Sequence, residues 1–336
     1  MNDYCDALIE QIGFFGKDEK RAVDTVYLGG GTPSLLGPDN LRRLCLAVRA
    51  AFNLCDPEIT LEANPADNLL DTFLAASTSG VNRISLGVQS AVEQELKVLN
   101  RRHTNSDVIK AVDDARKAGI DNISLDLMLG IPHQTRQSLN TTLKFLTDLE
   151  PKHISAYILK VEDSTPLAKM GYTVADDSLC ADLYLDASKT LTNAGFEHYE
   201  VSNFAKAGYK SRHNLRYWNL SEYIGIGPSA HSFYKGKRFY CEPDLKAFLN
   251  NPAYTPDGEG GKADEYIMLN LRTNKGIDFN ALKLEYNIDI TPALELFKKL
   301  EKNKLGVLSE HNFKLTAEGF LVSNSIIADV LLECNL

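Results

Sequence analysis

The chain has 336 residues, a formal net charge of −9, and ordinary fractions of hydrophobic (44%) and charged (24%) side chains. This composition can bury a core, and the length predicts one large barrel-like domain or two domains. No block of lysine or arginine stands out, so binding of nucleic acid through a basic face is disfavoured. No apolar run reaches the roughly 18 residues of a membrane helix, and the start of the chain lacks the pattern of a secretory signal. We therefore expect a cytoplasmic protein.

Short apolar runs alternate with amphipathic stretches through the first half of the chain. Strands are predicted at residues 25–28, 58–62, 83–88, 122–129 and 153–159, and helices at residues 40–52, 69–77, 93–99, 106–118, 139–149 and 176–193. Asp39 or Asn40 is expected to start the first of these helices, and Ser106 the fourth. Alternation of this kind is typical of βα units with a parallel sheet. The strands read as nearly continuous apolar runs, which predicts a sheet covered on both faces.

The composition changes from about residue 235 onward. Prolines and glycines between residues 243 and 261 predict a linker-like passage, followed by helices at residues 264–271, 279–286 and 292–303. Residues 306–322 predict a short hairpin and a final helix, an arrangement that resembles a winged helix. Because the segment is not strongly basic, we expect a packing or lid module rather than a DNA-binding one. The predicted domains are residues 1–240 and 241–336.

Functional side chains of a parallel βα barrel lie at the carboxyl ends of its strands. Here the first strand leads into a glycine loop, the second ends in Glu62, the third leads to Gln89, and the fourth contains Asp126. The loop, GGGTP, lacks the lysine of a P-loop and the third glycine of a dinucleotide fingerprint. No helix is predicted directly after it, which also disfavours phosphate binding.

An α-amino acid group is the ligand that these residues match best. Gly30, Gly31, Thr32 and Glu62 can accept hydrogen bonds from its ammonium, and Arg101 can pair with its carboxylate in a bidentate manner. Gln89 and Asp126 can bind ribose hydroxyls. The glycine loop is therefore predicted to hold a small zwitterion.

Several segments carry a family resemblance. GGGTPSLL, EITLEANP, RISLGVQS…LNRRHT and ISLDLMLGIPHQT resemble the radical S-adenosylmethionine (SAM) enzymes related to oxygen-independent coproporphyrinogen III oxidase. HNLRYW and the later IMLNLRT…GID…LTAEG are similar to the haem-chaperone, HemW-like branch of that group. The resemblance covers residues 3–326. It implies an incomplete parallel (β/α)6-type radical SAM barrel, an α/β fold, with a C-terminal helical, winged-helix-like module.

The resemblance also implies ligands and partners. SAM would be bound by Gly30, Gly31, Thr32, Glu62, Gln89, Arg101 and Asp126. Haem would be bound by His213, Asn214, Tyr217 and Trp218, with His213 as the candidate ligand of the haem iron. The implied function is a chaperone that delivers haem to an acceptor protein, with a homodimer and peripheral contact with membrane-bound acceptors left open. The alternatives are a coproporphyrinogen III oxidase-like radical enzyme and a degenerate, cluster-free SAM-binding protein.

One feature of the family is missing from this sequence. Its members hold a 4Fe–4S cluster with CxxxCxxC near the end of the first barrel strand, whereas the six cysteines here are dispersed without even a CxxC pair. Cys5 lies in YCDAL, which resembles the helix that follows the cluster loop, and we expect it to be an ordinary helical residue. We therefore expect that the first strand and the cluster loop precede the given sequence, the alternative being a truly short, cluster-free protein. In either case residues 25–28 are expected to form an open sheet edge. The chain as given is predicted not to cleave SAM.

Overall fold

The computed structural model describes residues 1–17, 20–65, 68–162, 166–172 and 175–336. The chain divides into two units. The barrel unit comprises Met1–Glu197, Ser202–His213 and Phe248–Asn251, and the second unit comprises His198–Val201, Asn214–Ala247 and Pro252–Leu336. Each helix in the described part of the chain is too short or too polar to span a lipid bilayer.

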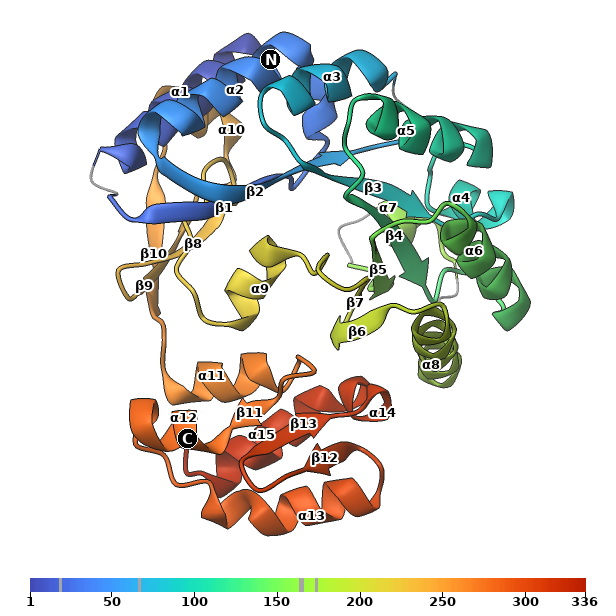
Figure 1. Ribbon diagram of the computed structural model, residues 1–336, viewed down its shortest axis with the longest axis vertical. Coiled ribbons are helices and arrows are strands. Elements are labelled where there is room, and N and C mark those ends of the chain that lie inside the picture. Colours follow the sequence, from blue (N-terminus) through green and yellow to red (C-terminus); the bar gives the residue numbers. More distant parts are fainter. Residues whose placement is uncertain (18–19, 66–67, 163–165, 173–174) are drawn as a thin grey trace. The chain divides into compact units, whose positions relative to one another are not determined.

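The barrel unit is built on a curled sheet whose first five strands are parallel and follow one another in chain order (Figure 1). These strands are β1 (Ala22–Leu28), β2 (Asn53–Ala63), β3 (Arg83–Gln89), β4 (Ile123–Leu129) and β5 (His153–Ile158). Beyond β5 the sheet continues with β7 (Asn203–Ala205), antiparallel to β5, and then β6 (Glu197–Glu200). The predicted incomplete α/β barrel is confirmed, and β1 is an edge strand as expected.

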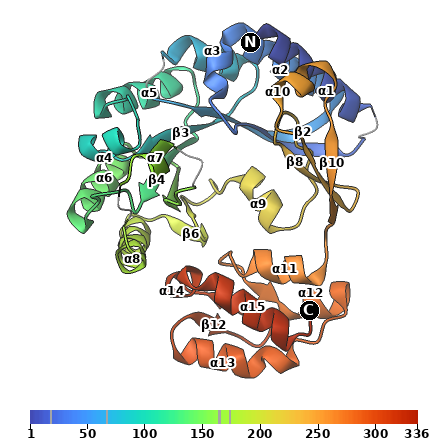
Figure 2. The same ribbon diagram turned by 180° about the vertical axis from the view of Figure 1, so that it is seen from behind.

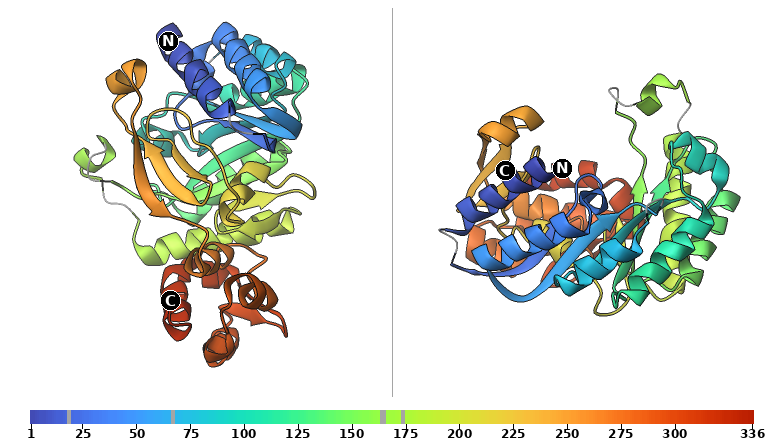
Figure 3. Two further views of the ribbon diagram at one scale, coloured as in Figure 1. Left: turned by 90° about the vertical axis from the view of Figure 1, so that its left-hand side faces the viewer. Right: turned by 90° about the horizontal axis from the view of Figure 1, so that it is seen from above.

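Helices connect these strands and cover the outer face of the sheet (Figures 1 and 3). They are α1 (Asn2–Gly16), α2 (Pro38–Ala51), α3 (Leu70–Thr78), α4 (Glu93–Val98), α5 (Asn105–Lys117), α6 (Arg136–Asp148) and α8 (Asp177–Asn193). The short α7 (Pro166–Lys169) precedes α8 in the chain. Two predicted helix starts were wrong. Pro38 opens α2 after Gly37, and α5 is capped by Thr104 in a reciprocal capping box with Asp107.

The inner face of the sheet carries mostly polar side chains, so the prediction of nearly continuous apolar strands was wrong. Outward-pointing residues such as Leu61, Leu86 and Leu125 are fully buried under the helices. The alternate residues point inward and are mostly polar, as the two-residue period of a strand dictates. The inward set is Thr25, Tyr27, Glu58, Thr60, Glu62, Arg83, Ser85, Ser124, Asp126, His153 and Ser155.

The second unit contains an antiparallel sheet of β8 (His231–Tyr234), β9 (Lys237–Cys241) and β10 (Tyr254–Glu259). The passage predicted to be linker-like is therefore structured, and it also includes α10 (Leu245–Asn250). Its prolines misled the prediction because they occupy positions that a sheet tolerates. Pro256 lies in β10, an edge strand, where a missing backbone N–H costs no ladder hydrogen bond.

The rest of the second unit is mainly helical, as predicted (Figure 2). It contains α11 (Ala263–Asn270), β11 (Ile277–Asp278), α12 (Phe279–Tyr286), α13 (Leu294–Lys302), β12 (Gly306–Leu308), β13 (Asn312–Leu315), α14 (Ala317–Leu321) and α15 (Ser323–Glu333). Helices α12 and α13 with the β12–β13 hairpin form the winged-helix-like part, and α15 was not predicted. Phe297 stacks between Phe279 and Phe313 in its core, with ring centroids 5.9 and 4.2 Å away.

Candidate functional site

The glycine loop follows β1 directly and is fastened to Glu62 at the end of β2. Gly30 has a left-handed backbone (φ 84°) and donates its N–H to Glu62 Oε2 at 3.0 Å. The Tyr27 hydroxyl donates to Glu62 Oε1 at 2.8 Å. A Cβ atom on Gly29 would lie 2.7 Å from the Glu62 carboxyl group, so this close approach requires glycine. A Cβ atom on Gly31 would meet no described atom within 4 Å, which leaves that backbone accessible.

The segment after the loop differs from the prediction. A 3-10 turn, η1 (Pro33–Leu36), starts immediately, with Thr32 as its N-cap residue. The prediction that no helical segment follows the loop directly was therefore wrong. A proline at the first position has a backbone already suited to helical geometry, which explains the turn. A single turn is too short to supply the macrodipole of a phosphate-binding helix.

The side chains of Gln89 and Arg101 both lie near Gly87 in β3. A Cβ atom on Gly87 would lie 3.0 Å from Gln89 Nε2 and 4.0 Å from a guanidinium nitrogen of Arg101. Gln89 has a φ of 67°, which is uncommon for a residue other than glycine. Such backbone conformations concentrate at functional sites. The structure thus places the Gln89 amide and the Arg101 guanidinium near the same strand residue, Gly87, as the sequence predicted for one rim of the sheet.

Asp126 lies further along the inner face, on β4. Ser85 Oγ donates to its carboxylate at 3.2 Å. Burial raises the pKa of Asp126 to about 6, although a hydrogen bond from Ser155 and the charge of Arg83 oppose this shift. The negative charge of Glu62 raises the Asp126 pKa further. The two predicted carboxylates are therefore close enough to influence each other.

These residues fit the amino acid end of SAM but not an iron–sulfur cluster. Carboxylate and carbonyl oxygens suit an ammonium group, and the Arg101 guanidinium suits a carboxylate. In contrast, the described residues include no group of three or more His, Cys, Asp or Glu side chains that could hold a metal ion. All six cysteines are free, and Cys5 is buried in α1, as expected.

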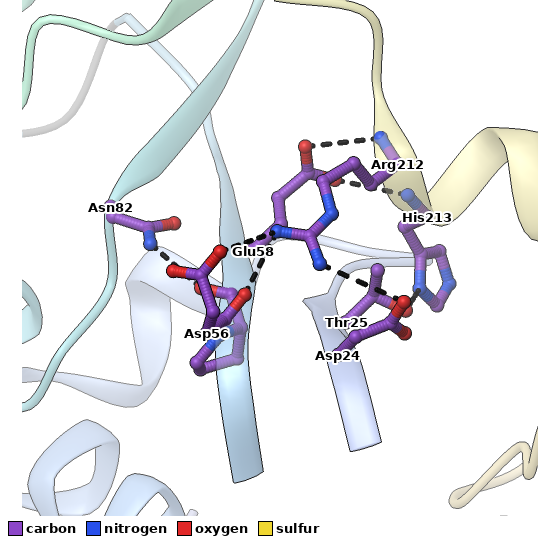
Figure 4. A network of polar contacts seen from close by, with 8 residues as sticks. Asp24, Thr25, Asp56, Glu58, Asn82, Arg212 and His213 are labelled. Atoms are coloured by element: carbon purple, nitrogen blue, oxygen red, sulfur yellow. Dashed lines mark hydrogen bonds and ion pairs between the residues drawn. The ribbon is translucent and has the colours of Figure 1, made fainter. Parts of the chain in front are cut away.

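A second polar cluster surrounds the start of α9 (Arg212–Trp218), as Figure 4 shows. The backbone N–H groups of Arg212 and His213 both donate to the Glu58 carboxylate, each at 3.0 Å. Glu58 is only 6% exposed. The pairing of β1 and β2 shifts register just before Glu58, and bulges of this kind redirect side chains. The shift places Glu58 opposite Thr25.

The imidazole of His213 lies against two inward residues of β1. Its Nδ1 atom is 3.0 Å from Thr25 Oγ1, and its ring stacks on Tyr27 with centroids 5.0 Å apart. Arg212 reinforces the start of the helix, because its guanidinium donates to the Asp56 carbonyl at 2.8 Å. Tyr27 therefore touches His213 with its ring and Glu62 with its hydroxyl.

The other predicted haem residues follow on α9 but belong to the second unit. The Tyr217 side chain is 40% exposed, and its ring packs edge-on against Tyr223 at 4.7 Å. Asn214 and Trp218 are partly exposed on the same helix. Their predicted role in haem binding stays a prediction.

Comparison with known proteins places the chain in a family. A family model described as the Radical SAM superfamily matches residues 4–146, and one described as the HemN C-terminal domain matches residues 262–322. The protein named haem chaperone HemW of Lactococcus lactis is 31% identical over 99% of this chain and 90% of its own length. The chain belongs to the HemW family of radical SAM proteins. The HemW of Bacillus subtilis is similarly related, at 30% identity over 99% of this chain and 92% of that protein.

Two further matches refine this relationship. The HemW of Escherichia coli is 41% identical, but the match covers 63% of this chain and 56% of that protein, little more than half of its length. The solved structure of the radical SAM enzyme coproporphyrinogen III oxidase (HemN) of E. coli shares the fold with a TM-score of 0.84 at 23% identity, over 98% of this chain and 82% of that one. Membership of the radical SAM superfamily implies SAM and a 4Fe–4S cluster as cofactors.

The contacts that hold His213 were not predicted. Thr25 and Tyr27 were read only as part of an apolar run, and Glu58 only as the start of a strand. Thr25 and Tyr27 flank the apolar Val26, and Glu58 precedes the apolar Ile59. This alternation was the available signal, because successive residues of a strand point to opposite faces of the sheet. Their partner His213 lies more than 150 residues further along the chain, where no local pattern indicates a contact.

Proposed function

We propose that this chain binds haem through His213 and passes it to an acceptor protein, as the name of its HemW relatives indicates. The observation that carries the proposal is the way the barrel unit fixes this histidine. Its backbone is bound by Glu58 and its ring by Thr25 and Tyr27. An imidazole held in one orientation is a suitable axial ligand for haem iron.

The neighbouring residues of α9 suit the haem macrocycle. Tyr217 lies four residues after His213, so the two positions are one helical turn apart. An exposed aromatic ring such as Tyr217 can stack on a porphyrin, and Trp218 offers a second aromatic surface. Asn214 can donate a hydrogen bond to a propionate. The same proposal includes an acceptor protein for the haem, a homodimer and a cytoplasmic location.

The rim at the carboxyl ends of the strands is proposed to bind SAM. Gly30, Gly31, Thr32 and Glu62 would hold the ammonium group, Arg101 the carboxylate, and Gln89 and Asp126 the ribose. SAM supplies an electrophilic sulfonium that radical SAM proteins cleave with an electron from their cluster. Because the described residues do not fit a cluster, no cleavage step is assigned to them.

Haemin titration followed by absorption tests the haem proposal. The wild-type chain should bind haemin with a shifted Soret band, and His213→Ala should weaken this binding at least tenfold. His311→Ala, which changes an exposed histidine of the second unit, serves as a matched control and should bind as the wild type does. Equal binding by wild type and His213→Ala, with the same spectrum, would exclude His213 as the ligand.

A further inference from the structure

Strand β3 ends in a three-residue turn that is centred on Gln89. The Ser90 N–H donates to the Val88 carbonyl at 2.8 Å, and Gln89 between them has a φ of 67°. A hydrogen bond to the carbonyl two residues earlier, around a residue of positive φ, defines a γ-turn of the rare and strained kind. The pairing of β3 with β4 shifts register at the same place, between Leu86 and Gln89. The chain therefore leaves β3 through a strained turn centred on a residue that is proposed to bind SAM.

The first anchor of this turn is a buried histidine from the loop between α4 and α5. His103 is only 3% exposed, and its Nε2 atom lies 3.0 Å from the Val88 carbonyl oxygen. A carbonyl oxygen can only accept a hydrogen bond, so Nε2 carries the proton. Burial lowers the pKa of His103, although the bond to Val88 opposes this shift, so the ring is neutral at pH 7. The Val88 carbonyl therefore accepts two hydrogen bonds, one within the turn and one from His103.

The second anchor holds the other end of the turn. Ser90 is fully buried, and its hydroxyl donates to Glu95 Oε2 at 2.6 Å. The other oxygen of Glu95 accepts from Ser138 Oγ at 2.5 Å, and Thr142 Oγ1 accepts the N–H of Ala91 at 3.1 Å. Ser138 and Thr142 both belong to α6, so the segment after the turn is fixed to a helix of the next βα unit. Strained conformations persist only where their surroundings fix them in this way.

His103 also bears on the second SAM-binding group of this part of the rim. Arg101 lies two residues before His103 in the same loop, and its charge further lowers the pKa of that histidine. The side chains of Arg101 and Gln89 both lie near Gly87. A single side chain, that of His103, thus ties the loop that carries Arg101 to the strand end that carries Gln89.

We infer that His103 is a positioning residue for SAM binding, because its bond to the Val88 carbonyl holds the Gln89 turn and the Arg101 loop together. The inference rests on the proposed SAM site. His103 does not touch SAM in this account, and it acts only through the turn and through its own loop. Without this bond the turn is expected to relax to an ordinary backbone, so that SAM binding would have to re-form the strained conformation.

The strained turn can be tested without any ligand. Gln89→Gly and Gln89→Ala both remove the amide, but only glycine adopts a positive φ without a steric penalty. Gln89→Gly should therefore unfold at a higher urea concentration than Gln89→Ala. In an ordinary strand or helix the order is the reverse, because glycine gains more conformational entropy on unfolding. A urea midpoint of Gln89→Gly at or below that of Gln89→Ala would refute the strained turn, and the positioning role with it.

Equilibrium dialysis against radiolabelled SAM tests the positioning role. His103→Ala should weaken SAM binding about 5- to 100-fold, because binding must then re-form the strained turn. His103→Gln should recover most of the affinity, since its amide N–H can reach the Val88 carbonyl, whereas the shorter side chain of His103→Asn should not. His311→Ala, at an exposed histidine of the second unit, serves as the control and should bind SAM as the wild type does.

The outcomes separate this inference from the proposed SAM site. If the wild type binds SAM and His103→Ala binds it equally well, His103 has no positioning role while the SAM site stands. The same conclusion follows if His103→Gln binds SAM no better than His103→Asn, and this pair decides the question where urea unfolding shows that His103→Ala is not folded. A wild type that binds no SAM would refute the SAM site, and the positioning role with it.

Nitrogen NMR of chain labelled with 15N-histidine gives a readout that does not depend on SAM. The signals of His103 are assigned from their loss in His103→Gln. They should show a neutral ring that is protonated at Nε2 at pH 7, because the Val88 carbonyl needs a donor. A His103 ring protonated only at Nδ1 would contradict the bond to Val88 and overturn the inference.

Discussion

Asp126→Asn is expected to stabilise the folded chain at pH 7.5 by about 2–3 kcal/mol. Burial raises the pKa of this carboxyl to about 6 in the folded protein, whereas an unfolded aspartate titrates near 3.9. The folded state therefore prefers the protonated form, whose stabilising contribution is complete below about pH 3.9 and is lost as the pH rises through about 6. At neutral pH the ionised carboxylate costs about 3 kcal/mol, which the neutral amide avoids.

Urea unfolding between pH 4 and pH 8 measures this effect. The difference in the free energy of unfolding between Asp126→Asn and wild type should be small near pH 4 and should grow as the pH rises through 6. Asp113→Asn removes an exposed carboxyl of α5 and serves as the control. Its free energy of unfolding should change with pH in the same way as that of the wild type. A variant that is less stable than wild type at pH 7.5 would show that the Ser85 and Ser155 hydrogen bonds to the carboxylate outweigh its burial.

Glu58→Ala is expected to destabilise the chain by about 3–5 kcal/mol. The substitution removes two hydrogen bonds to a buried charged acceptor, each of which contributes about 1.5–3 kcal/mol. It also leaves two backbone N–H groups at the start of α9 without their acceptor. The helix should then fray at Arg212 and His213, and haemin affinity should fall with stability.

Glu58→Gln distinguishes this explanation from a simple effect of charge. The amide keeps one acceptor oxygen. The free energy of unfolding of Glu58→Gln should therefore lie between those of wild type and Glu58→Ala. Glu93→Ala, at an exposed position of α4, should change stability little, because surface ion pairs such as Glu93–Lys97 contribute little. A Glu58→Ala variant as stable as wild type, measured by urea unfolding, would contradict the role assigned to this carboxylate.

The barrel could be predicted from the sequence because its signals are local. Runs such as residues 83–88 and 122–129 combine β-branched residues with regular spacing, and each is followed by an amphipathic helix. The rim residues were equally predictable, because chain order alone places Glu62 and Gln89 at the carboxyl ends of neighbouring strands. The structure adds that Glu62 is already bonded to the glycine loop and that Gln89 adopts a left-handed backbone.

The cluster around His213 could not be predicted in the same way. Helix α9 has only seven residues and follows an irregular segment, so periodicity gives no signal for it. Glu58 satisfies the start of that helix from a distant strand, a role that local capping rules do not cover. The β8–β10 sheet was missed because Pro256 and its neighbouring glycines look like a linker when the edge position of β10 is unknown.

Pulsed electron paramagnetic resonance of the ferric haem complex tests the central claim most directly. Chain labelled with 15N-histidine and loaded with haemin should show hyperfine coupling between the iron and an imidazole nitrogen. The coupling should disappear in His213→Ala and should persist in His311→Ala. A coupling that is absent from the wild type, or that survives unchanged in His213→Ala, would contradict the assignment of His213 as the haem ligand of this HemW-family chain.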